Sequence, residues 1–117
     1  MIMLSGCVLL LLACTTVKKI EDTGKIVVTG DEQQKGRLLI AGSDCFTCHS
    51  IEKEQIGPAY SVISLRYRAT SVNIEKLADK IINGGEGNWG KIPMTPHTAM
   101  PKEDAKTMVK FILTLKK

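Results

Sequence analysis

Five consecutive residues, Cys45-Phe46-Thr47-Cys48-His49, constrain the fold of this chain more than any other feature. The pattern Cys-x-x-Cys-His is typical of covalent attachment of c-type haem. Two thiols about one helical turn apart can bond the two vinyl groups on one edge of the porphyrin, and the adjacent imidazole can coordinate the iron. A small domain with 4% aromatic residues gains little stability from burying side chains, so we expect a disulfide, a metal or a cofactor to stabilise it. The motif predicts one haem c.

Two other chemistries use closely spaced cysteines, and the sequence argues against both. A thiol–disulfide oxidoreductase places Cys-x-x-Cys near a βαβ unit, whereas this chain has almost no strand signal. Structural zinc needs a fourth ligand and a second spaced pair of ligands. The remaining candidates are His97 and two N-terminal cysteines, Cys7 and Cys14, which we assign to an export segment. Haem is therefore the favoured cofactor.

The N-terminus resembles an export signal. Residues 1–13 carry no charge and are too short for a bilayer core, which needs roughly 20 apolar residues. Leu11-Leu12-Ala13-Cys14 resembles a bacterial lipobox, so we predict a lipid on Cys14 and a location on the periplasmic side of a bacterial membrane. A cleaved signal without lipid is the alternative, because no Lys or Arg precedes the apolar run. Cys7 also fits a lipobox, but its apolar lead-in is shorter than a signal requires.

The remainder is predicted to be a flexible tether, residues 14–31, followed by one all-α domain, residues 32–117. Two segments have apolar residues at i, i+3, i+4 and i+7, which is the spacing of one helix face. These stripes are Ile74, Leu77, Ala78, Ile81 and Ile82, and then Ala105, Met108, Val109, Ile112 and Leu115. Residues 32–41 are predicted to form an earlier helix, and residues 59–67 a short one.

The helix ends also have sequence signals. Ser71 or Asn73 can cap one long helix, and Gly84-Gly85 can end it. Pro101 suits the first position of the last helix. Between these two helices, residues 84–96 are rich in Gly and Pro, so we expect no regular element there. A loop of this length in so small a domain is normally functional.

From residue 36 onward, the sequence resembles the small class I monohaem cytochromes c of bacteria, of the short c-551-like type. The resemblance is carried by Cys45 to His49, Ile56 to Tyr60, Leu77 to Gly84, Gly87 to Met94 and the C-terminal amphipathic helix. It implies a class I cytochrome c fold, in which three to four helices wrap around one covalently bound haem. It also implies that the first and last helices cross.

The iron needs a second axial ligand besides His49, and the sequence offers Met94, Met100, Met108, His97 or water. Met108 belongs to the apolar stripe of the last helix, so we expect it to pack in the core. Met94 lies in the proline-stiffened loop where the family places its ligand, and we predict that it binds iron. Met100 is the main rival because it also lies beside a proline. His/Met ligation leaves no open iron site and favours electron transfer over catalysis.

The resemblance implies further roles for Pro58, Trp89, Lys80 and His97. The Pro58 carbonyl would accept the Nδ1–H of His49, the alternative being a turn proline. Trp89 would donate to a haem propionate with help from Lys80; the alternatives are core packing for Trp89 and solvated surface for Lys80. The family often has an amide at the position of His97 that donates to the ligand sulfur. A neutral His97 could donate the same bond and couple the potential to pH, or it is an exposed loop residue.

Together these features predict a one-electron carrier rather than an enzyme, acting as a monomer between a redox protein donor and a redox protein acceptor. The net charge of +4 comes from scattered basic residues, which argues against a nucleic-acid partner. Lys53, Lys91 and Lys102 are expected to ring the haem edge and attract an acidic partner, or to be ordinary surface. The alternatives are a haem subunit of a larger membrane oxidoreductase, and a haem peroxidase or gas-binding protein with Met94 displaced.

Overall fold

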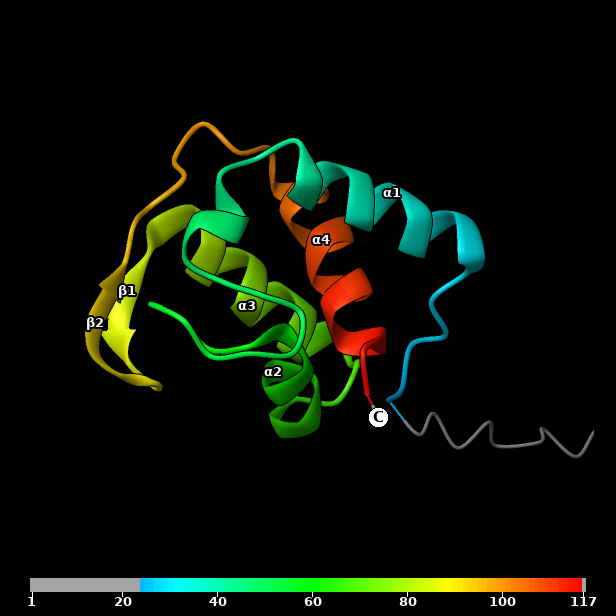
Figure 1. Ribbon diagram of the computed structural model, residues 1–117. Helices are drawn as coiled ribbons and strands as arrows, with labels where there is room; N and C mark the ends of the chain where they lie inside the picture. Colours follow the sequence, from blue (N-terminus) through cyan, green and yellow to red (C-terminus); the bar gives the residue numbers. More distant parts are fainter. Residues whose placement is uncertain (1–23, 117) are drawn as a thin grey trace, which may run out of the picture.

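The computed structural model describes residues 24–116, which fold around a central C-terminal helix (Figure 1). The elements are α1 (Gly30–Ala41), the 3-10 helix η1 (Cys45–Thr47), α2 (Tyr60–Arg66), α3 (Ser71–Asn83), β1 (Gly85–Gly87), β2 (Gly90–Met94) and α4 (Lys102–Thr114). Helix α4 packs against α1, α2 and α3. The predicted signal segment, residues 1–13, and the predicted lipid site at Cys14 lie outside the described residues. Within them, no helix has the length and hydropathy to cross a membrane.

Helix α1 begins two residues earlier than predicted, because Thr29 caps it. The Thr29 hydroxyl accepts the Glu32 backbone N–H at 3.3 Å, and the Glu32 carboxylate accepts the Thr29 backbone N–H at 3.0 Å, which forms a capping box. The other carboxylate oxygen of Glu32 lies 2.6 Å from Nζ of Lys110 in α4. The Lys110 hydrogen bond, followed by the Thr29 bond, lowers the pKa of Glu32 to about 2. The start of α1 is thus tied to α4.

The last residues of the predicted tether lie against the domain. The backbone N–H of Ile26 donates to the Ala69 carbonyl at 2.6 Å, and the Ile26 side chain packs on the core. Residues 26–28 form no strand.

Helices α1 and α4 cross, as the resemblance implies (Figure 1). Gly36 of α1 lies at the point where the two helices meet. A Cβ at Gly36 would lie 2.5 Å from the carbonyl oxygen of Thr107 and 2.7 Å from Cβ of Phe111. Only glycine therefore allows the two backbones to approach this closely.

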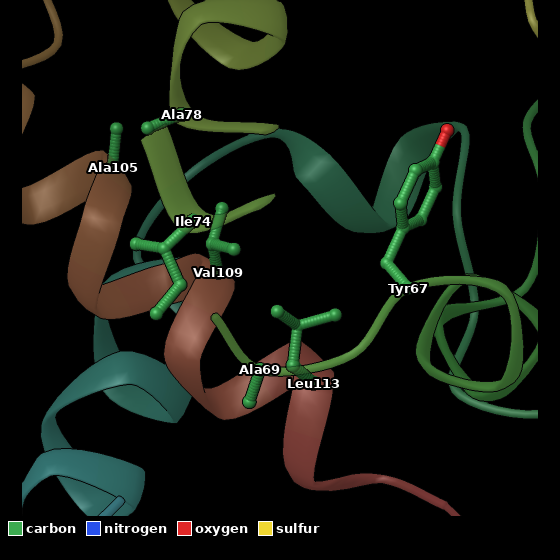
Figure 2. Packing of buried hydrophobic residues seen from close by; sticks show 7 residues of the cluster. All are labelled: Tyr67, Ala69, Ile74, Ala78, Ala105, Val109 and Leu113. Atoms are coloured by element: carbon green, nitrogen blue, oxygen red, sulfur yellow. The ribbon is translucent and has the colours of Figure 1, made fainter. Parts of the chain in front are cut away.

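The core consists of two groups of buried side chains that share α4. Figure 2 shows the first group: Tyr67, Ala69, Ile74, Ala78, Ala105, Val109 and Leu113. The second group is Ile40, Tyr60, Met108, Phe111 and Ile112. Ala78 and Ala105 are fully buried, and their small size lets α3 and α4 approach closely. The predicted stripes do face the core, and Met108 is buried as expected.

The predicted caps were partly wrong. Thr70, rather than Ser71 or Asn73, caps α3, because its hydroxyl accepts the backbone N–H of Asn73 at 3.3 Å. Gly84 ends α3 as predicted, with a positive φ of 66°. Pro101 is the residue before α4 rather than its first residue.

The expectation that residues 84–96 form no regular element was wrong. Strands β1 and β2 pair antiparallel, with Gly85 opposite Met94 and Gly87 opposite Gly90. Gly85, Gly87 and Gly90 have φ values of 110°, 104° and 110°, which side-chain-bearing residues rarely adopt. The glycines that argued against a strand therefore allow a tight, twisted hairpin. The fold is otherwise helical, and the predicted class is confirmed.

Candidate functional site

A cavity of about 350 Å³ lies between α1, α2, α3, α4, the η1 segment and the hairpin. Much of its lining is aliphatic: Ile40, Ile63, Leu77, Ile81, Val109 and Ile112. All eight predicted site residues also line it: Cys45, Cys48, His49, Pro58, Lys80, Trp89, Met94 and His97. The fold therefore gathers residues that lie up to 52 positions apart into one apolar space.

The 3-10 turn η1 places the two cysteines beside this cavity. The backbone N–H groups of Cys48 and His49 both donate to the Cys45 carbonyl, at 3.2 and 3.0 Å. Burial, and secondarily the charge of Asp44, raises the pKa of the Cys45 thiol. Thiol–disulfide enzymes depend on a lowered thiol pKa, so this environment argues against that alternative.

His49 is buried and held in one orientation. Its Nδ1 lies 2.7 Å from the carbonyl oxygen of Pro58, as the resemblance implies. Because a carbonyl only accepts, Nδ1 carries a proton, and in the neutral imidazole Nε2 is therefore the nitrogen with the lone pair. The imidazole stacks on the Tyr60 ring, with centroids 5.2 Å apart and planes 19° apart. A Cβ at Gly57 would lie 2.5 Å from Cε1 of His49, so glycine is required there.

Tyr60 also contacts the attachment segment. Its ring lies tilted against that of Phe46 in η1, with centroids 6.0 Å apart, and burial raises the pKa of Tyr60. The sequence analysis did not single out Tyr60. The sequence signal that could have identified it is its position in the segment Ile56 to Tyr60, which carries part of the family resemblance.

Met94 reaches the cavity from the end of β2. Its backbone pairs with Gly85, and a Cβ at Gly84 would collide with its carbonyl oxygen. The end of α3 therefore positions Met94. Met100 is partly buried against both core groups and is not among the cavity-lining residues. Met108 lines the cavity from within the core.

Trp89 lies in the hairpin turn with 39% of its surface exposed, so it is not a core residue. The Arg66 guanidinium stands 4.6 Å from the centroid of the indole ring, and Nη1 of Arg66 donates to the Asn88 carbonyl at 2.7 Å. Arg66 thereby holds the hairpin tip against α2, a contact that sequence spacing did not reveal. Lys80 is half-buried in the last turn of α3, beside Gly85.

The expected ring of lysines needs one correction. Lys102 pairs with Asp79 and, at 3.2 Å, with Glu75, both on α3. Its charge is therefore compensated within the protein. Lys53 and Lys91 are exposed but do not line the cavity.

His97 has a partner that the sequence did not predict. Its Nε2 lies 2.8 Å from Oδ1 of Asp44, and its side chain is 21% exposed. Its Nδ1 is buried and has no hydrogen-bond partner among the described residues.

The cavity suits a haem better than a bare metal ion. Within residues 24–116, no three His, Cys, Asp or Glu side chains gather as a zinc site would require. The apolar lining fits a macrocycle, the thiols of Cys45 and Cys48 would hold it covalently, and Nε2 of His49 would be the nitrogen facing the iron.

Comparisons with known proteins identify the family of this chain. The family model of cytochrome c matches residues 33–116. The chain belongs to the cytochrome c family. Cytochrome c-551 of Allochromatium vinosum is 40% identical to it over 78 residues, covering 67% of this chain and 83% of that protein. Cytochrome c-551 of Pseudomonas denitrificans is 38% identical over 81 residues, covering 69% and 98%.

The crystal structure of wild-type Nitrosomonas europaea cytochrome c552 has the same fold. It aligns with a TM-score of 0.64 and 38% identity, covering 68% of this chain and 99% of that chain. This protein is thus a small class I monohaem cytochrome c. Its cofactor is covalently bound haem c, and Cys45 and Cys48 are the two cysteines of its Cys-x-x-Cys-His motif. It transfers electrons rather than catalysing a reaction.

Proposed function

We propose that this cytochrome c carries single electrons with its iron held between Nε2 of His49 and the sulfur of Met94, and that it works outside the cytoplasm. The haem supplies the redox chemistry, because its iron takes up and releases one electron. The protein supplies the two ligands, the covalent attachment and a largely apolar enclosure.

The observation that carries the proposal is that His49 and Met94 line one cavity, with the ring of His49 and the backbone of Met94 each held in place. The Pro58 carbonyl holds the His49 proton on Nδ1, which leaves Nε2 available and makes it a stronger ligand. Pairing with Gly85 fixes the Met94 backbone. A thioether presented by a fixed backbone loses little conformational entropy when it binds.

Two strong axial ligands favour electron transfer over catalysis. With both positions filled, the iron offers no site to a peroxide or a gas. His/Met ligation also raises the reduction potential. A peroxidase or gas-binding protein would instead need Met94 to stay away from the iron.

The experiment compares Met94→Leu with the matched variant Met100→Leu, after a pyridine haemochrome spectrum has established two thioether bonds. Met94→Leu should abolish the far-red sulfur-to-iron band of the ferric protein, lower the potential and admit carbon monoxide to the ferrous iron. Met100→Leu should change none of these, because Met100 packs against the core groups. If Met100→Leu loses the band and Met94→Leu keeps it, Met100 is the ligand instead.

The export proposal concerns residues outside the described structure and is supported by their sequence. The uncharged run up to Ala13 followed by Cys14 favours a lipid-anchored protein on the periplasmic side of a bacterial membrane. Mature protein should partition into detergent and should lose this property in Cys14→Ala. An unmodified chain that begins after Cys14, found by mass spectrometry, would exclude the anchor and leave export intact.

A further inference from the structure

The pair formed by Asp44 and His97 joins two segments that matter to the haem. Asp44 immediately precedes Cys45, and His97 lies three residues after Met94. Oδ1 of Asp44 and Nε2 of His97 are 2.8 Å apart, although the residues are 53 positions apart in the chain. Both side chains line the cavity. The pair therefore connects the segment that binds the haem covalently to the loop that carries the proposed iron ligand.

The Asp44 side chain is directed toward His97 and not toward the turn that follows it. Asp44 occupies the position before η1, where an aspartate normally accepts a backbone N–H of the following turn. Here it makes no capping hydrogen bond with its side chain. The carboxylate is directed to His97 instead, and the hydrogen bond from His97, with its charge, lowers the pKa of Asp44.

Among the described residues, the other hydrogen bonds of the loop after Met94 are made by its backbone. Met94 itself is held by β pairing with Gly85, and the His97 backbone N–H donates to the Ile81 carbonyl at 3.1 Å. The Met100 N–H donates to the His97 carbonyl at 2.9 Å. In the described chain, Asp44 provides the side-chain bond that fastens His97 to the attachment segment.

We propose that Asp44 and His97 form a latch that holds the Met94 loop against the haem-attachment segment and slows the departure of Met94 from the iron. Asp44 is thus a positioning residue that acts through His97. This inference rests on the proposed ligation by Met94. A small added imidazole can bind the iron only after Met94 leaves, so its limiting binding rate reports the opening of the loop.

The test measures that limiting rate for the ferric holoprotein in a double-variant cycle of Asp44→Asn and His97→Ala. Asp44→Asn should raise the rate about two- to fivefold, the range expected for a contact between a carboxylate and a histidine at the protein surface. The same substitution should have no effect in the His97→Ala background, because the partner is gone. Asp31→Asn, an exposed charge in the first turn of α1, is the control for net charge and should match the wild type.

A second readout does not involve the iron ligand. Hydrogen exchange of the His97 and Met100 backbone amides should accelerate by a similar factor in Asp44→Asn and not in Asp31→Asn. Unchanged imidazole and exchange rates in Asp44→Asn would overturn the latch, while a far-red band lost in Met94→Leu would still support the proposed ligation. If Met94→Leu keeps the band, Met94 is not the iron ligand, and the proposed effect of the latch on iron ligation is wrong as well.

Discussion

Replacing Gly36 with alanine should destabilise the protein, although the same change stabilises most helices. In a helix interior, Gly→Ala gains about 1 kcal/mol from helix propensity. At Gly36, the added Cβ would lie 2.5 Å from the Thr107 carbonyl oxygen and 2.7 Å from Cβ of Phe111. Both atoms belong to or adjoin the α4 backbone, so neither can move away without moving the helix.

The magnitude follows from these two opposing effects. Restoring ordinary contact, at 3.4 Å or more, requires α1 and α4 to separate by close to an ångström along this contact. Overpacking costs about 1–3 kcal/mol, and we expect about 2–3 kcal/mol here because the clash involves the α4 backbone. This cost exceeds the propensity gain. We therefore expect a net loss of about 1–2 kcal/mol, with each kcal/mol lowering Tm by about 4–8 °C in a domain of this size.

The assay is denaturant unfolding of the ferric holoprotein, after its haem content has been matched to that of the wild type. Gly30→Ala is the control because it lies in the same helix with nothing within 4 Å of the added Cβ. It should stay within about 0.5 kcal/mol of the wild type. If Gly36→Ala proves as stable as Gly30→Ala, the close crossing of α1 and α4 is not what requires glycine.

Glu32→Gln should lower stability at pH 7, and the difference from the wild type should shrink as pH falls. The Lys110 hydrogen bond depresses the Glu32 pKa from 4.5 to about 2, so its contribution is complete above pH 4.5 and is lost toward pH 2. Urea unfolding at pH 7, 4 and 3 tests this; a constant difference would show that the ion pair is not responsible. Gly57→Ala should push the His49 ring off its position, because the added Cβ would lie 2.5 Å from Cε1. Absorbance melting should show earlier loss of the iron–histidine bond than in Gly42→Ala, whose nearest contact is an ordinary 3.4 Å; equal melting would contradict this reasoning.

Sequence reasoning succeeded where local patterns determine the outcome. The stripes that include Ile74 and Ala105 specify helix faces because apolar burial follows the helical repeat. The short motif from Cys45 to His49 predicted a haem c protein, because covalent attachment of one haem requires two thiols and a histidine close together in the sequence. Gly84 was recognised as a helix end for its conformational freedom.

It failed where a structure depends on pairing between distant segments. The hairpin has no alternating apolar pattern, so only its backbone pairing identifies it. The contact of Asp44 with His97 depends on how two loops meet. The partners of Lys102 lie on another helix. No local sequence signal encodes such contacts. The cap of α3, by contrast, does have a local signal, and Thr70 lies one residue before the predicted Ser71.

The exposed hairpin has a further consequence for the behaviour of the protein at high concentration. A two-stranded ribbon has two open edges, and such edges can recruit strands from other molecules. Here β1 has only three residues, of which Gly85 and Gly87 have positive φ, and β2 contains Pro93, which has no N–H to donate. Neither edge presents a regular row of hydrogen-bonding groups. The hairpin can therefore present Met94 to the cavity without becoming a template for aggregation.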